Sequence, residues 1–210
     1  FRRVLFRSPF FVVPPRGVRN ARIAVLASTF TYVIYANHTR PEWDNDTVWR
    51  DAWLSQVAQW GCYPHNPGDH REYAMSTYNN HPDGSGISTS SWRRPMLTMR
   101  LGFLTYPYES LRGSGLRHFP ADSHLTYWLE DLGFDYDIVT DWELHHEGAG
   151  VLEGYEVVMT GSHPEYHTRN TLDALQTYRD GGGRFCYMGG NGFYWKVALS
   201  PETDGIIEIR

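Results

Sequence analysis

The chain of 210 residues contains 41% hydrophobic and 20% charged residues, which is the composition of an ordinary globular domain. Its formal net charge is −5 and its 19 Lys and Arg are spread along the chain, so we expect no nucleic-acid partner. No apolar run is long enough to span a membrane, and the two cysteines lack a second pair that would suggest a disulfide framework. A cytoplasmic protein with no membrane partner is the prediction.

The first residues carry a separate signal. Residues 1–8 read FRRVLFRS, the in-frame translation of a common sequencing adapter, and we predict that they are not native. Residues 9–20 are predicted to be a linker. Residues 21–210 are predicted to form a single α/β domain of catalytic type, truncated at its C-terminal end because no closing element follows Ile207.

Secondary-structure signals alternate regularly in much of the chain. Residues 21–27 form an apolar run typical of a buried parallel strand, and residues 37–92 predict a long excursion over a site. The later predictions are a helix at 122–132 capped by Asp122 or Ser123, a helix at 169–180, and strands at 136–140, 155–160 and 184–188. This order predicts a mostly parallel sheet flanked by helices, flavodoxin-like or similar to class I glutamine amidotransferases.

In such a sheet, ligands bind outside the carboxyl ends of the strands, where loops from neighbouring strands converge. Polar segments at residues 29–38, 161–168 and 189–195 follow predicted strands and should meet there. The side chains that they would bring to the crevice are Tyr35, His163, Glu165 and Asn191.

The turn GSHPEY, which begins at Gly161, has the setting of a nucleophile elbow, a sharp turn that presents Ser or Cys after a strand. Its central residue is His163, and Cys186 falls inside a predicted apolar strand, which argues against a cysteine-dependent glutaminase. Ser162 could act as a nucleophile with His163, but adjacent residues on a tight turn usually point apart.

A metal site is the other chemical hypothesis. Glu165 is a carboxylate at a strand end, and Tyr35 and Tyr78 lie on segments that could fold over it. Phenolate and carboxylate oxygens are hard donors that suit ferric iron, provided that the metal draws off phenolic protons with a pKa near ~10. The competing interpretation is that these tyrosines are simply part of the core.

Four segments together resemble the large (beta) subunit of the N,N-dimethylformamidase family. They are TYVIYANH, STYNNHPDGSGISTSSWRRP, GSHPEYHTRNTLDALQTYRDGGG and FCYMGGNGFYW, and the likeness runs from about residue 22 to residue 195. The resemblance implies one iron ion held by Tyr35, Tyr78 and Glu165, with Tyr32 and Tyr73 left as alternatives for the two tyrosines. It also implies a catalytic role for His163 and a substrate contact for Asn191.

The implied activity is hydrolysis of a small formamide to formate and an amine. Iron would act as a Lewis acid, His163 as the general base and Asn191 as a hydrogen-bond donor to the oxyanion. The resemblance also implies a small subunit and a homo-oligomer as partners. Two alternatives remain: a related metal amidase with another amide substrate, and a non-catalytic amidotransferase-like domain that binds a ligand or partner.

Other polar and aromatic residues receive a plainer interpretation. His118 is predicted to be solvated at a helix end, and Arg94 is assigned no chemistry. Residues 193–195, Phe-Tyr-Trp, could either wall an apolar pocket or belong to the core beneath the last strand.

Overall fold

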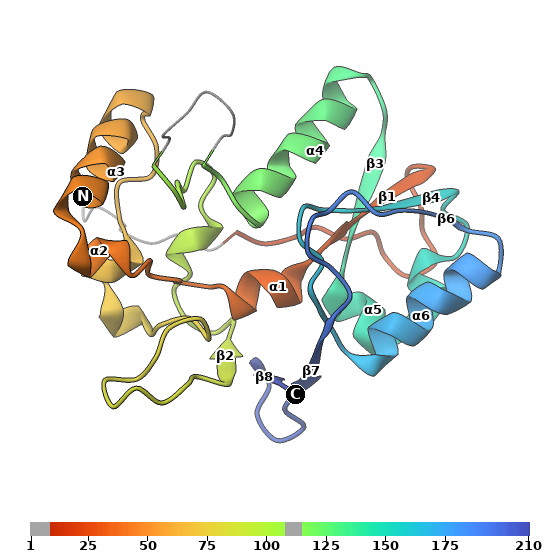
Figure 1. Ribbon diagram of the computed structural model, residues 1–210. Helices are drawn as coiled ribbons and strands as arrows, with labels where there is room; N and C mark the ends of the chain where they lie inside the picture. Colours follow the sequence, from red (N-terminus) through yellow and green to blue (C-terminus); the bar gives the residue numbers. More distant parts are fainter. Residues whose placement is uncertain (1–8, 108–114) are drawn as a thin grey trace, which may run out of the picture.

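The main sheet is a parallel α/β sheet, as the sequence predicts. A computed structural model describes residues 9–107 and 115–210; the predicted adapter segment 1–8 lies outside the described residues. The strands of this sheet are β1 (Ile23–Ala27), β3 (Tyr136–Thr140), β4 (Val157–Thr160) and β6 (Arg184–Cys186). Their spatial order is β3-β1-β4-β6 (Figure 1), which in chain order is 2-1-3-4, the flavodoxin-like arrangement.

Helices cover both faces of this sheet, as Figure 1 shows. They are α4 (Phe119–Asp131), α5 (Asp141–Glu147), the 3-10 helix η4 (Gly148–Leu152) and α6 (Arg169–Asp180). Successive side chains of a strand point to opposite faces. Leu26 therefore packs toward α5, η4 and α6, while Val25 packs against Leu129 of α4. Burial on both faces explains why β1 reads as an unbroken apolar run.

Helix α4 begins three residues before the predicted start. Its N-cap is His118 and Pro120 lies in its first turn, where the missing N–H of proline costs nothing. The predicted cap, Asp122 or Ser123, is therefore wrong. The Asp122 carboxylate accepts a hydrogen bond from the backbone N–H of Ser162 instead, so it joins the helix to the turn after β4.

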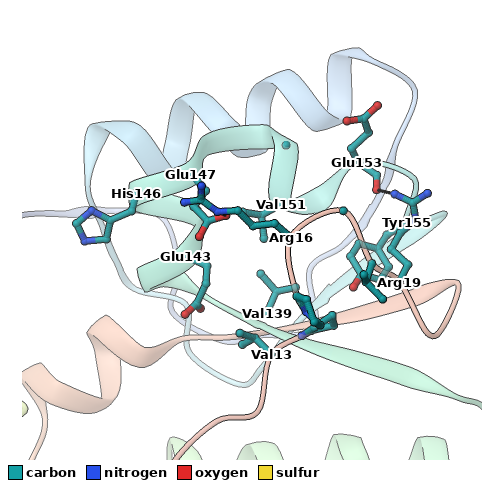
Figure 2. Close-up of a pocket in the computed structure, with 15 residues that line it drawn as sticks. Val13, Arg16, Arg19, Val139, Glu143, His146, Glu147, Val151, Glu153 and Tyr155 are labelled. Atoms are coloured by element: carbon teal, nitrogen blue, oxygen red, sulfur yellow. Dashed lines mark hydrogen bonds and ion pairs between the residues drawn. The ribbon is translucent and has the colours of Figure 1, made fainter.

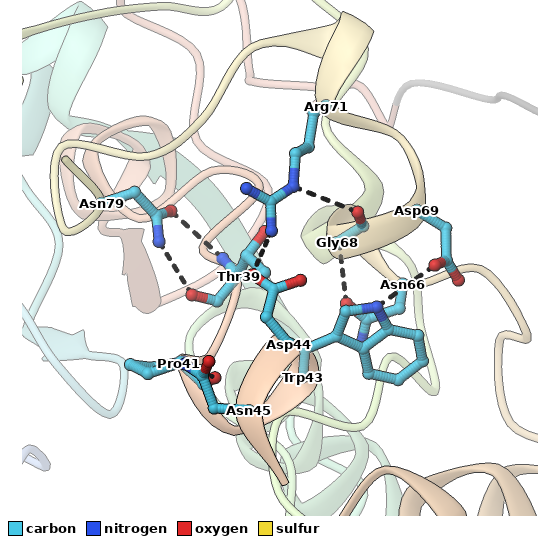
Figure 3. A network of polar contacts seen from close by, with 10 residues as sticks. All are labelled: Thr39, Pro41, Trp43, Asp44, Asn45, Asn66, Gly68, Asp69, Arg71 and Asn79. Carbon is cyan, nitrogen blue, oxygen red and sulfur yellow. Dashed lines mark hydrogen bonds and ion pairs between the residues drawn. The ribbon is translucent and has the colours of Figure 1, made fainter. Parts of the chain in front are cut away.

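The segment between β1 and α4, which includes the predicted excursion at residues 37–92, contains regular structure. Its elements are α1 (Thr29–Ile34), α2 (Glu42–Asn45), α3 (Thr47–Trp60), η1 (Pro67–Asp69), η2 (Arg71–Tyr73), β2 (Thr89–Ser91) and η3 (Leu97–Met99). Helices α2 and α3 lie away from the main sheet (Figure 1) and share a core around Trp43 and Trp53. In Figure 3, Asn79 bonds both backbone groups of Thr39, which fastens the excursion beside the end of α1.

A second, smaller sheet lies against α1. It has the order β2-β8-β7-β5, with β5 (Tyr166–His167), β7 (Trp195–Leu199) and β8 (Ile206–Ile209). Strand β5 pairs in parallel with β7, so the segment after β6 lies beside the turn after β4. The core between this sheet and α1 includes Ile34, Tyr166 and Ile207.

Two further features concern the cysteines and the helices. Cys62 and Cys186 are both free. In the described part of the chain, no helix has both the length and the apolar character needed to cross a membrane.

Candidate functional site

The predicted site residues gather at the switch point of the main sheet. Strands β1 and β4 are neighbours, and their carboxyl ends lead into α1 and into the turn at residues 161–165. Ligands of doubly wound sheets bind where the strand order reverses, which here is between these two strands. Tyr35 ends α1 as its C-cap, and His163 and Glu165 lie on the turn after β4.

Two tyrosines from distant segments stack on each other beside this turn. Tyr35 is buried at 8% exposure, whereas Tyr78, from the excursion, is 42% exposed. Their ring centroids are 4.2 Å apart with an interplanar angle of 12°. The Tyr78 hydroxyl lies 2.5 Å from the hydroxyl of Tyr166, the residue after Glu165. The excursion thus delivers Tyr78 to the end of α1.

Glu165 lies at the centre of a cluster of tyrosines, Tyr35, Tyr78, Tyr166 and Tyr194, which is called the cluster below. Its side chain is fully buried, and Oε2 accepts hydrogen bonds from the hydroxyls of Tyr35 at 3.1 Å and Tyr194 at 2.8 Å. Its other oxygen, Oε1, is buried without a partner. Burial raises the pKa of Glu165, and the hydrogen bonds from Tyr194 and Tyr35 oppose that rise. Burial also raises the pKa of Tyr35, so this phenol is neutral.

The alternative tyrosines lie elsewhere. The Tyr32 hydroxyl bonds to the Asp122 carboxylate. Tyr73 stacks on His70, with ring centroids 5.6 Å apart. Tyr35 bonds to Glu165, and Tyr78 stacks on Tyr35 and bonds to Tyr166, whereas Tyr32 and Tyr73 have other partners.

His163 faces the cluster from the same turn. Its Nε2 accepts a hydrogen bond from Nη2 of Arg117 at 3.4 Å, and its Nδ1 is buried without a partner. Burial and then the Arg117 charge lower the pKa of His163, which favours the neutral imidazole. A neutral imidazole has one nitrogen that can accept a proton.

His118 is not a solvated helix-end residue, so that prediction is wrong. Its ring stacks on Tyr35 at a centroid distance of 4.1 Å and meets His163 edge-on at 5.6 Å. Its backbone φ of 53° lies in a region that residues other than glycine rarely adopt. The strained N-cap of α4 thereby places an aromatic ring between Tyr35 and the turn.

Asn191 reaches the cluster through a tyrosine. It is exposed, and its Nδ2 lies 3.4 Å from the Tyr194 hydroxyl, which in turn donates to Glu165. Phe193, Tyr194 and Trp195 are 38%, 53% and 43% exposed, so they are not core beneath the last strand. They form an aromatic edge beside the site.

Arg94 holds the tyrosine segments together, although the sequence assigned it no chemistry. Its guanidinium donates to the carbonyls of Ala74 at 2.7 Å, Met75 at 2.9 Å and Ala36 at 3.0 Å. Ala36 follows Tyr35, and Met75 lies three residues before Tyr78. Arg94 therefore ties the segment of one predicted ligand to the segment of the other.

A hollow elsewhere in the described residues does not share this chemistry. A hollow of about 710 Å³ (Figure 2) lies between residues 13–19 and the α5–η4 segment, and none of the predicted site residues lines it. Arg16 crosses this hollow to pair with Glu147 at 2.8 Å. No group of three or more His, Cys, Asp or Glu side chains with metal-site spacing occurs among the described residues.

Three residues that contact the predicted site residues were not assigned to the site from the sequence. Tyr194 was considered only as a pocket wall, yet its hydroxyl bonds to Glu165. Tyr166 and Arg117 were not singled out. The position of Tyr166 directly after Glu165 is the only local signal, since the contacts of Arg117 and Tyr194 depend on the tertiary fold.

Comparison with known proteins identifies the family of the chain. The family described as "N,N-dimethylformamidase beta subunit-like, C-terminal" matches residues 6–209. The N,N-dimethylformamidase beta subunit of Paracoccus aminophilus is 41% identical over 208 residues, and that of an Alcaligenes species is 39% identical over the same length. Each alignment covers 96% of this chain and 26% of the relative, so the chain spans about a quarter of their length. The chain belongs to the N,N-dimethylformamidase beta subunit-like, C-terminal family.

Proposed function

We propose that this chain carries the active site of an iron-dependent amidohydrolase that cleaves the C–N bond of small formamides. The observation that carries the proposal is the fully buried carboxylate of Glu165, which accepts hydrogen bonds from Tyr35 and Tyr194, with Tyr78 stacked on Tyr35 beside it. The names of the relatives supply the substrate class, N,N-dimethylformamide.

The cluster suits a hard metal ion. Tyr35, Tyr78 and Glu165 would hold the ion, because all three offer oxygen donors and Oε1 of Glu165 is buried without a partner. Burial keeps the Tyr35 phenol neutral in this structure, so binding would require loss of its proton. When bound, ferric iron would supply Lewis-acid polarisation of the carbonyl or of a water molecule.

His163 and Asn191 would carry the remaining chemistry. A neutral His163 would take a proton from water and return it to the departing amine. Asn191 would donate its side-chain N–H to the developing oxyanion, and its exposed position leaves that group accessible. His163 lies two residues before Glu165 on the same turn, and Asn191 is connected to Glu165 through the Tyr194 hydroxyl.

The family name also supports a multi-subunit assembly. Both relatives are named as beta subunits, so we include a small partner subunit and a homo-oligomer in the proposal. The chain covers about a quarter of those subunits. Experiments therefore use the full polypeptide encoded by the gene, together with any subunit that copurifies.

Removal of the Glu165 carboxylate tests the metal site. In the Glu165→Gln variant we expect iron content and the visible phenolate-to-iron band to be lost, and formamide hydrolysis to fall by at least ~10²-fold. Glu156→Gln is the matched control, because Glu156 lies in an exposed ion pair with Arg22. A colourless, iron-free wild type would overturn the iron mechanism and favour the binding-domain alternative.

A second pair of variants tests which phenol binds the metal. We expect Tyr78→Phe to lose the visible band, and Tyr194→Phe to keep it, since we assign Tyr194 to holding Glu165 through its hydroxyl at 2.8 Å. The opposite result would assign the second phenolate to Tyr194.

A further inference from the structure

Arg117 lines the site between its two histidines. The residue lies just before α4, and its Nη2 approaches Nε2 of His163 at 3.4 Å. Its guanidinium carbon is 6.0 Å from the centre of the Tyr35 ring. Together with Tyr35, His38 and His118 it borders a cavity of about 20 Å³, which has room for about one water molecule. Arg117 is therefore part of the wall around the proposed metal site.

Within the described residues, the charge of Arg117 has no carboxylate partner. Among residues 9–107 and 115–210, no Asp or Glu forms an ion pair with it. Its Nη1 donates to the Tyr106 hydroxyl at 3.0 Å, and Nη2 donates to His163. A guanidinium has five N–H donors in a planar fork, and the described part of the chain accepts from only two of the nitrogens.

A neighbouring arginine provides the contrast. Arg40 lies 4.6 Å from the centre of the Tyr106 ring, and Arg117 lies 5.9 Å from it. Arg40 is paired with Glu42 at 3.3 Å. Two guanidinium groups thus flank one tyrosine, and of these two only Arg117 contacts His163 and has no carboxylate partner among the described residues.

The position of Arg117 links it to both functional groups. Its Nη2 lies 3.4 Å from Nε2 of His163, and its guanidinium carbon lies 6.0 Å from the ring centre of Tyr35, whose hydroxyl donates to Glu165. Arg117 therefore lies beside both groups that would flank a bound substrate.

We propose that Arg117 is a further substrate-contacting residue, which binds the carbonyl oxygen of the amide and then the carboxylate of the released formate-type product. This inference rests on the proposed function. In the reaction, a C–O bond forms with water as the C–N bond breaks, and the products are a carboxylate and a protonated amine. A guanidinium suits this change, because its fork pairs with a carboxylate through two parallel hydrogen bonds.

The test uses Arg117→Ala in the full polypeptide. We expect kcat/KM for a formamide to fall by on the order of 10²-fold, and the formate inhibition constant to rise at least about tenfold. Iron content and the phenolate band should not change. Added guanidinium ion should restore part of the activity of Arg117→Ala, an effect that a purely structural role would not produce. If Arg117→Ala folds poorly, the same measurements are made on Arg117→Lys, which retains the charge but lacks the planar fork.

Arg40→Ala is the matched control and should keep formate affinity within about threefold of wild type. A calorimetric titration of the protein with formate separates this inference from the proposed function. If wild type hydrolyses no formamide, the proposed function fails, and formate binding still tests Arg117. Equal formate binding by wild type and Arg117→Ala, or no binding by wild type, would overturn the role of Arg117.

Discussion

The main sheet and the wall of the site are held together in different ways. The wall is the set of segments around Tyr35, Tyr78 and the turn at residues 161–165. In the sheet, β1 pairs with β3 and β4 along continuous parallel ladders, and both faces are covered by apolar side chains. In the wall, irregular segments are joined by a few partly or fully buried polar side chains. Arg94 donates to five backbone carbonyls, and Asp122 accepts from the Ser162 N–H and the Tyr32 hydroxyl.

This difference separates stability from site geometry. Apolar burial is non-directional and is shared by many side chains, so one change in the sheet lowers stability without moving the site. A polar side chain that bonds several segments has directional contacts, and its loss leaves buried partners unsatisfied. Variants in the sheet should therefore affect unfolding first, and variants in the wall should affect the tyrosine cluster first.

The largest loss of stability is expected in the sheet. Leu26 lies in β1 and is 1% exposed. Leu26→Ala should lower the free energy of unfolding by about 3 kcal/mol, because it removes buried methyl groups and leaves a cavity. The urea-unfolding midpoint measures this loss. The folded fraction should retain the iron signature of wild type.

Leu172→Ala is the control for this change, because Leu172 lies on α6 at 39% exposure. Its cost should be a small part of that for Leu26→Ala. Loss of the iron signature from folded Leu26→Ala would contradict the separation between sheet and wall.

The next largest effect is expected in the wall at Arg94. Burial lowers the pKa of Arg94 to about 10, but the group remains charged at neutral pH. Arg94→Gln should cost about 2 kcal/mol, because it leaves carbonyls near Tyr35 and Tyr78 without donors. Faster amide hydrogen exchange at residues 73–78 and a weaker phenolate band are the expected signs, with exchange in β1 unchanged.

The adjacent arginine is a close control. Arg93 is exposed and forms an ion pair with Asp204, and pairs of this kind contribute little to stability. Arg93→Gln should leave the band and the exchange of residues 73–78 as in wild type. Equal effects of the two substitutions would remove the special role of Arg94.

The sheet was predictable because its signals are local. The predicted strand at 136–140 and helix at 169–180 coincide with β3 and α6. The other strands differ only at their ends, where one or two residues lie outside the hydrogen-bonded ladder. The predicted start of α4 was wrong because Asp122, a residue type that often caps helices, instead makes a tertiary contact with Ser162.

The site was predictable only where a strand end or the family resemblance marked it. Glu165 and His163 follow β4 directly, so position in the sheet indicated them. Tyr78 lies in the excursion, and only the resemblance assigned it a role. The contacts of Arg94, Arg117 and His118 arise when segments distant in sequence meet, and single-residue patterns carry no signal for such contacts.

A smaller effect is expected at Asp122. The Asp122 carboxylate is buried and accepts from the Ser162 N–H at 2.5 Å. Asp122→Asn keeps one acceptor oxygen but loses the charge, so we expect a cost of about 1 kcal/mol. Hydrogen exchange should become faster in the turn at residues 161–165. Asp131→Asn, at the exposed end of the same helix, should leave that turn unchanged.

The smallest effect is expected from His145, which joins α5 to the cap of α6. Its Nδ1 lies 2.8 Å from Oγ1 of Thr168, the N-cap of α6, and burial lowers its pKa. The unfolded chain therefore binds this proton more readily, so stability should fall as pH drops below about 6.5. Partial exposure should keep the loss below the ~1.4 kcal/mol that one full pKa unit represents. His145→Gln should reduce the change in the unfolding midpoint between pH 7 and pH 5. His124→Gln, at an exposed position of α4, should leave that change as in wild type. An identical acid dependence in both variants would show that the contact between His145 and Thr168 does not contribute.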